Sequence, residues 1–164
     1  MNLKKVGVIS LTFLTISFMG ILMCVGLLFG EDSEGNGSSG TSPGGTSVSE
    51  EVLKHRAMVE KYAKESDITE YIPILLAIIQ VESGGTMEDV MQSSESAGLP
   101  PNSLSTEASI KQGCLYFASL VKRSKELGCD QDSIIQAYNY GGGYLDHVGK
   151  NGKKHSFALA ESFS

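Results

Sequence analysis

The sequence has little of what a nucleic-acid-binding or metal-binding protein needs. It contains 13 lysine and arginine residues against 19 acidic ones, and its formal net charge is −6. Nucleic-acid partners require a basic face, so the charge balance argues against them and fits a neutral or cationic polymer at least as well. Three cysteines and three histidines show no ligand spacing. We therefore expect no metal and no cofactor.

The few cysteines do not predict a disulfide. Cys24 lies in an uncharged run near the N-terminus, which leaves Cys114 and Cys129. If residues 107–127 form one helix, Cys114 lies about 20 Å from its C-terminal end, whereas a disulfide needs Cα atoms within roughly 7 Å. Cys114 falls on the apolar face of that helix and is expected to be a core residue.

Residues 6–29 contain no charged side chain. As a helix this run spans roughly 36 Å, enough to cross a bilayer. Its length, and the lack of a small-residue cleavage motif before Glu31, favour a retained anchor over a cleaved secretion signal, which stays the alternative. Lys4 and Lys5 place the N-terminus in the cytoplasm and the rest of the chain outside. We expect residues 1–30 to form a cytoplasmic tip and a single transmembrane helix in the cell membrane.

Residues 31–47 lack apolar side chains and are rich in glycine and serine. Such a segment cannot bury hydrophobic surface and predicts a flexible linker. The folded domain is therefore expected to cover residues 48–164, an ordinary size for one core.

No segment of the domain alternates convincingly between apolar and polar residues, so we predict an all-α fold. Ser47 and Glu50 match a capping box, and the apolar spacing extends a first helix to about Lys64. Residues 72–81, "IPILLAIIQV", are apolar nearly all round and predict a central buried helix that stops at Gly84 and Gly85. Further helices are expected from Ser105 to just before Gly128, and after Asp130 or Asp132 through Tyr140.

Glu82 ends the apolar run and is the first candidate catalytic residue. Apolar surroundings disfavour the charged form of a carboxyl group and raise its pKa. A carboxylic acid that is still protonated near neutral pH can donate a proton to a leaving group. The two glycines that follow would leave this carboxyl at the edge of a cleft, and this arrangement is typical of the acid in a glycosidase pair. On position alone, an exposed glutamate in the last helical turn with no catalytic role is the alternative.

The stretch that follows, residues 86–105, is long for a loop in a compact domain, and such loops are usually functional. It contains three carboxyl groups that could face Glu82, those of Glu88, Asp89 and Glu95. It also contains hydroxyl and amide groups in "MQSSES", of the kind that hydrogen-bond sugars. Later in the chain, "QAYNYGGG" places a tyrosine and an asparagine at a helix end, where they could line a sugar site.

These motifs, in this order, resemble the lysozyme and soluble lytic transglycosylase superfamily. The motifs are "ES" at the end of a buried helix, "MQ" in the next loop, a long helix with "GCLYFASL", and "AYN" before glycines. The pattern "ESGG…D-x-MQSSES" is most similar to the CwlT-like muramidases of Gram-positive conjugative elements. The resemblance implies a lysozyme-like helical domain that cuts the β-1,4 bond between N-acetylmuramic acid and N-acetylglucosamine.

The resemblance also implies roles for individual residues. Glu82 falls on the catalytic acid and Asp89 on the second acidic position of the CwlT-like branch. The residues that fall on substrate-binding or otherwise matched positions are Ser83, Gln92, Ser94, Tyr138 and Asn139. Family members often carry a second peptidase domain of the NlpC/P60 type, but the residues after the matched region offer no support for peptide cleavage.

Two alternatives to a hydrolase stay open on the sequence. If Asp89 points away from the cleft, Glu82 alone could act as acid and then base, and the 6-hydroxyl of muramic acid would attack to give a 1,6-anhydro product. A module that only binds peptidoglycan or a secretion-machine partner is the other alternative. The expected partners are peptidoglycan strands, the membrane through the N-terminal helix, and conjugation (type IV secretion) proteins. The expected role is local opening of the wall for conjugative transfer.

Overall fold

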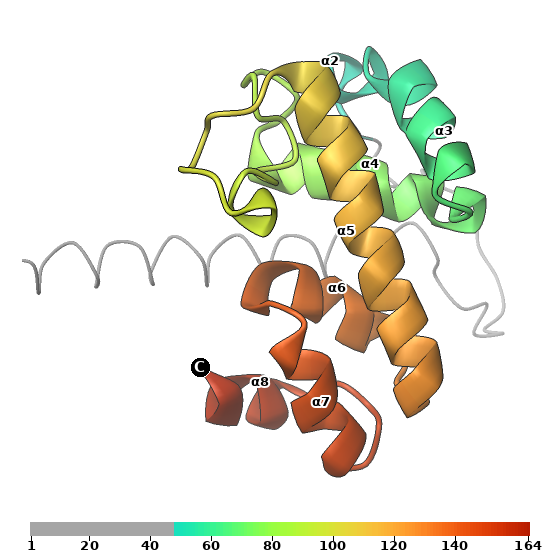
Figure 1. Ribbon diagram of the computed structural model, residues 1–164, viewed down its shortest axis with the longest axis vertical. Helices are drawn as coiled ribbons and strands as arrows, with labels where there is room; N and C mark the ends of the chain where they lie inside the picture. Colours follow the sequence, from blue (N-terminus) through green and yellow to red (C-terminus); the bar gives the residue numbers. More distant parts are fainter. Residues whose placement is uncertain (1–47) are drawn as a thin grey trace, which may run out of the picture.

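The computed structural model describes residues 48–164, and this part of the chain is entirely helical (Figure 1). The predicted all-α fold is confirmed for these residues. The predicted anchor, residues 1–30, and the predicted linker, residues 31–47, lie outside the described residues. Within residues 48–164, no helix combines the length and hydropathy needed to span a bilayer.

The helices follow one another with short connections, apart from one long loop. The α-helices are α2 (Glu50–Leu53), α3 (Arg56–Glu65), α4 (Ile72–Glu82), α5 (Thr106–Leu127), α6 (Gln131–Tyr140), α7 (Gly143–Lys150) and α8 (Phe157–Phe163). Two 3₁₀ turns, η1 (Thr69–Tyr71) and η2 (Glu95–Ala97), precede α4 and interrupt the long loop.

Helix α4 is the central buried helix that its composition predicts. Pro73 lies in its first turn, where a missing N–H costs nothing. Every residue from Ile74 to Ile79 is buried, on all sides of the helix. The helix ends at Glu82, and Gly84 and Gly85 follow with φ of +62° and +79°. These left-handed conformations favour glycine and turn the chain away from the helix axis.

The start of the domain differs from the prediction. Ser49, not Ser47, is the N-cap, and its Oγ accepts a hydrogen bond from the Val52 N–H. The expected single helix to about Lys64 is wrong, because the chain turns at residues 54–55 between α2 and α3. At this turn the ring of His55 reaches the carbonyl of Gly85, 2.9 Å away. Such a tertiary contact is not encoded in helical periodicity.

Helix α5 forms the long axis of the fold. Figure 1 shows it running from the part of the molecule that contains α3 and α4 to the part that contains α6 and α7. As predicted, it buries Cys114 on its apolar face and ends before Gly128, which has a φ of +72°. Asp130 caps α6 through a hydrogen bond to the Ser133 N–H. Cys114 and Cys129 are both free thiols in the structure.

Candidate active site

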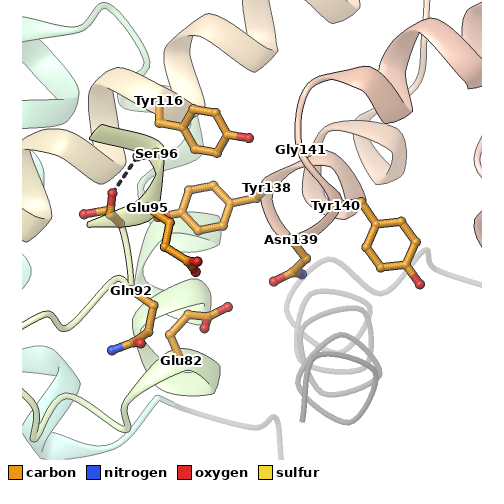
Figure 2. Close-up of a pocket in the computed structure, with 10 residues that line it drawn as sticks. Glu82, Gln92, Glu95, Ser96, Tyr116, Tyr138, Asn139, Tyr140 and Gly141 are labelled. Atoms are coloured by element: carbon orange, nitrogen blue, oxygen red, sulfur yellow. Dashed lines mark hydrogen bonds between the residues drawn. The ribbon is translucent and has the colours of Figure 1, made fainter. Parts of the chain in front are cut away.

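A pocket of about 400 Å³ opens between the end of α4, the long loop and the end of α6 (Figure 2). Its lining is polar and aromatic, it contains two carboxyl groups, and within the described part of the chain none of its residues is basic. The lining residues are Glu82, Gln92, Ser93, Glu95, Ser96, Tyr116, Tyr138, Asn139, Tyr140 and Gly141. Hydroxyl, amide and aromatic groups of this kind suit a neutral carbohydrate better than an anion.

Glu82 reaches the pocket because it is the last residue of α4. The turn behind it is fixed by Ser83, whose Oγ donates to the Val90 carbonyl at 2.8 Å and accepts from the Gly85 N–H at 3.1 Å. The side chain of Glu82 is half-buried rather than exposed to bulk solvent. The sequence-predicted acid therefore lies in a concave site beside Tyr138 and Asn139.

Glu95 supplies the second carboxyl group of the pocket. It begins the 3₁₀ turn η2, and Figure 2 shows its carboxyl group and that of Glu82 pointing into the same space. It was one of three loop carboxyl groups that the sequence offered as a partner for Glu82. The sequence alone did not select it, because a loop without periodicity does not reveal which side chains point inward.

Asp89 does not line the pocket. Its side chain is only 1% exposed. Its carboxylate accepts hydrogen bonds from the N–H groups of Ser93 (3.0 Å) and Ser94 (3.2 Å). It also accepts from the hydroxyls of Ser94 and Ser109, the latter at 2.6 Å. Burial opposes ionisation of Asp89, but the hydrogen bonds from Ser109, Ser94 and Ser93 outweigh it and hold the pKa below its ordinary value.

Ser83 and Ser94 likewise lie outside the pocket lining. Ser83 fixes the turn after α4, as described above. The Ser94 hydroxyl donates to Asp89 and accepts from the N–H groups of Ser103 (3.1 Å) and Leu104 (3.2 Å). The structure thus joins Ser94 and Asp89 in a buried network that closes the long loop on itself.

Gln92 lies between this buried network and the pocket. Its φ of +48° is rare for a residue with a side chain and is a strained conformation. Its amide nitrogen donates to the Asp89 carbonyl and to Asn102 Oδ1, both at 2.8 Å. The hydrogen bonds made by Asp89 with residues 93 and 94 hold the backbone on the C-terminal side of Gln92. Gln92 lines the pocket, and the substrate-binding role that the family resemblance implies for it stays a prediction.

Tyr138 and Asn139 form the α6 side of the pocket. The hydroxyl of Tyr138 donates to the Met91 carbonyl at 3.0 Å, which joins α6 to the long loop. Burial, and next the negative charge of Glu82, raise the pKa of Tyr138 well above its usual value, so it remains a neutral donor. Figure 2 shows the amide of Asn139 directed toward the carboxyl groups of Glu82 and Glu95. Its buried Nδ2 has no hydrogen-bond partner within the described residues.

Sequence reasoning did not single out five residues of the lining, and of these both serines fall in the "MQSSES" stretch; the five are Ser93, Ser96, Tyr116, Tyr140 and Gly141. Tyr116 comes from α5, and its ring centroid lies 5.4 Å from that of Tyr138. The signal for Tyr140 was present, because it directly follows the "AYN" motif. The hydroxyl of Ser96 donates to the Ser93 carbonyl at 2.6 Å and accepts from Gln112, which fixes η2 against α5.

The described residues contain no group of three or more histidine, cysteine or acidic side chains that could hold a metal ion. The two carboxyl groups of the pocket are accompanied by hydroxyl, amide and aromatic groups. This arrangement can supply a proton, accept a proton and hydrogen-bond a polar chain molecule.

The fold and this pocket define a class of protein, and comparison with known proteins identifies the same class. The model of the lysozyme-like family matches residues 49–164, and the chain belongs to that family. It is CwlT-like within the family, as the motifs indicated. The chain is 43% identical to the bifunctional muramidase/DL-endopeptidase CwlT of Bacillus subtilis over 118 residues, which are 71% of this chain and 35% of that protein.

Two further relatives extend the comparison. The chain is 38% identical to the uncharacterized membrane protein YocA of Bacillus subtilis, over 73% of this chain and 53% of that protein. The crystal structure of a Staphylococcus aureus Mu50 protein, described as similar to lipoprotein of the NLP/P60 family, superposes with a TM-score of 0.72 and 61% identity. That match covers 73% of this chain and 40% of the solved one. The chain thus spans from about a third to about half the length of these relatives.

Proposed function

We propose that the domain cleaves peptidoglycan strands by hydrolysing the β-1,4 bond between N-acetylmuramic acid and N-acetylglucosamine. The observation that carries the proposal is that Glu82 and Glu95 point into one pocket, walled by Tyr138 and Asn139. Two carboxyl groups across a sugar-sized site are what glycoside hydrolysis needs. Membership of the lysozyme-like family and the muramidase name of the Bacillus relative support the same activity.

In the proposed reaction Glu82 is the general acid. Its proton passes to the oxygen of the glycosidic bond as that bond to the anomeric carbon of muramic acid breaks, and N-acetylglucosamine leaves with a free 4-hydroxyl. The muramic acid ring develops oxocarbenium character. Glu82 is half-buried at the end of an apolar helix, and its carboxyl group points into the pocket, where it can reach the glycosidic oxygen.

Glu95 is the proposed base. A water molecule between Glu95 and the sugar attacks the anomeric carbon, and its proton passes to the Glu95 carboxylate as the new carbon–oxygen bond forms. The sum is addition of one water across the bond, with a new reducing end on muramic acid. Glu95 then loses its proton to solvent and Glu82 takes one up, so both carboxyl groups return to their starting protonation states.

Asp89, the second acid that the resemblance implied, has a different place in this proposal. Its carboxylate is already bonded to four donors, three in the loop and one, the Ser109 hydroxyl, on α5, so it contributes by holding Gln92 and Glu95 in place. The substrate-binding roles remain proposed for Gln92, Tyr138 and Asn139. Ser83 and Ser94 are proposed to act through the turn and the loop that they hold, rather than by touching the glycan.

Two measurements test the proposal: the turnover of three variants and the chemical identity of the cleavage product. Glu82→Gln should keep the fold and glycan binding but lose turnover by several orders of magnitude, and Glu95→Gln should lose about 100-fold or more. Glu88→Gln is the matched control, because Glu88 is exposed on the same loop outside the pocket. Mass spectrometry of released muropeptides should show reducing ends. A 1,6-anhydro product, lighter by one water, would instead establish a lytic transglycosylase.

A normal rate of wall clearance by Glu82→Gln would refute the acid assignment. Binding to insoluble peptidoglycan without any released fragment from the unsubstituted chain would refute the enzyme and leave a binding module or secretion-machine scaffold. If Glu95→Gln releases fragments at the same rate as the unsubstituted chain, Glu95 is not the base, although the domain is still a hydrolase.

The wider setting is also proposed from the sequence. Residues 1–30 would anchor the chain in the cell membrane, residues 31–47 would form a linker, and residues 48–164 would act on the wall outside. A linker of 17 residues would reach about 20 to 25 Å on average. Cleavage would then be local, which suits wall opening for conjugative transfer beside type IV secretion proteins. Fractionation of cells, with protease treatment of intact protoplasts, tests whether the domain is membrane-held and outside.

A further inference from the structure

We propose that residues 49–55, here called the N-terminal segment, position Glu82 for catalysis by holding the backbone on both sides of it. Gln80 and His55 are the positioning residues in this proposal, which rests on the function proposed above. Neither residue lines the pocket, so both act through Glu82 and not by contact with the glycan.

The first contact holds the chain just before Glu82. The backbone N–H of Ser49 donates to Oε1 of Gln80 at 2.7 Å, across 31 residues of sequence. Ser49 is the N-cap of α2, so its N–H is not used within the helix. Gln80 lies two residues before Glu82 on the last turn of α4, where its side-chain oxygen replaces water as the acceptor.

The second contact holds the chain just after Glu82. Nε2 of His55 lies 2.9 Å from the carbonyl oxygen of Gly85. A carbonyl only accepts, so the ring nitrogen must be the donor. This bond fixes the turn by which the chain leaves α4, and that turn is three residues from the reacting carboxyl group.

Direct packing accompanies these two hydrogen bonds. A Cβ added to Gly85 would lie 2.8 Å from both the Glu51 carbonyl carbon and the Val52 nitrogen, so the backbone of α2 is in contact with the turn. Val52 itself is completely buried and anchors α2 in the core. Ser83 is also bonded to Val90 in the long loop. The backbone around Glu82 is therefore held both by the N-terminal segment and by the long loop.

The consequence concerns rate more than affinity. Glu82 ends its helix, so the direction of its side chain depends on the turn at residues 83–85 and on what holds that turn. A misplacement of about 1 Å at a reacting group can cost about 100-fold in rate. Loss of these contacts should therefore lower kcat and leave KM nearly unchanged, since the residues that bind the glycan stay in place.

The experiment measures kcat and KM on glycan strands, with thermal unfolding in parallel, for the full chain and its variants. His55→Ala should lower kcat by about 10- to 100-fold with KM within about twofold. His55→Gln retains an N–H donor of similar reach and should restore most of the rate. Lys54→Ala is the control within the same segment, because Lys54 is exposed and bonds to Glu51 on the surface.

A second pair of variants tests the contribution of the Ser49 N–H to kcat, independently of the His55 variants. Ser49 has a φ of −62°, which proline adopts without strain, so Ser49→Pro removes the N–H and the capping hydroxyl together. Ser49→Ala removes the hydroxyl alone. The proline variant should have a kcat about fivefold or more below that of the alanine variant.

Equal kcat values for Ser49→Pro and Ser49→Ala would overturn the proposal and leave the proposed hydrolase in place. So would a loss of activity in His55→Ala that comes from a higher KM or that is proportional to the unfolded fraction. A chain that releases no fragment in its unsubstituted form would count against the proposed function instead. The two failures are thereby distinguishable.

Discussion

Replacing Asp89 by asparagine separates a carboxylate that reacts from one that holds the loop. In the structure both oxygens of Asp89 accept hydrogen bonds, from two backbone N–H groups and two serine hydroxyls. The amide of asparagine has the same shape but only one accepting oxygen. Its NH₂ group would face the N–H of Ser93 or Ser94, donor against donor.

The expected loss of stability follows from these contacts. Two charge-assisted hydrogen bonds disappear, each contributing about 1.5 to 3 kcal/mol, while the neutral amide is easier to bury and offsets part of the loss. We expect Asp89→Asn to lower the free energy of unfolding by about 3 kcal/mol. For a domain of this size that corresponds to a fall in Tm of about 10 °C.

The pH dependence of stability is a second, independent test of the role of Asp89. Hydrogen bonds hold the pKa of folded Asp89 below its ordinary value. Its contribution to stability is therefore fully present above the pKa of the unfolded state and is lost as pH falls through the lower, folded pKa. The stability difference between the unsubstituted chain and Asp89→Asn should shrink as the pH falls from about 5 toward about 3.

The assay combines urea or thermal unfolding by circular dichroism with cleavage of glycan strands. Glu88→Gln, at an exposed neighbouring position, should stay within about 0.5 kcal/mol of the parent. Glu95→Gln should lose activity and keep its Tm. Asp89→Asn should lower the Tm and keep most of its activity at temperatures where it is still folded. Full stability of Asp89→Asn, combined with complete loss of turnover, would refute the reasoning and return Asp89 to direct contact with the substrate.

Three further predictions concern the turn after Glu82 and the α6 side of the pocket. Gly84→Ala and Gly85→Ala both place a side chain at positive φ, but only the latter meets backbone, at 2.8 Å, so its Tm should fall further, by about 5 °C or more. Tyr138→Phe leaves the Met91 carbonyl without its donor and should cost about 1 to 3 kcal/mol in urea unfolding. Asn139→Ala removes an amide whose buried Nδ2 has no partner in the described residues, so KM for glycan strands should rise about 5- to 30-fold with no loss of Tm.

The helices could be predicted because their patterns are local. The apolar run that ends at Glu82 and the periodic apolar positions of α5 determine buried faces without reference to the rest of the chain. The break between α2 and α3 could not be predicted in this way. Its defining contact, from His55 to Gly85, joins residues 30 apart.

The residues of the candidate site also differ in whether local sequence patterns could predict their positions. Glu82 could be placed because a buried helix and two glycines fix where its side chain emerges. The choice among Glu88, Asp89 and Glu95 could not be made, because it depends on the direction of side chains within an irregular loop. Family resemblance favoured Asp89, yet the carboxyl group that lines the pocket is that of Glu95.

The buried Asp89 and the catalytic geometry are connected by one physical argument. A loop of this length has little regular structure of its own beyond the 3₁₀ turn η2, and it must still present Gln92 and Glu95 at defined positions. A carboxylate has two accepting oxygens and can satisfy four N–H and hydroxyl donors at once, whereas an amide has only one such oxygen. Burying that charge is costly unless every bond is made, so partial opening of the loop is disfavoured. The same network therefore helps to hold the strained φ of Gln92 and the loop side of the pocket.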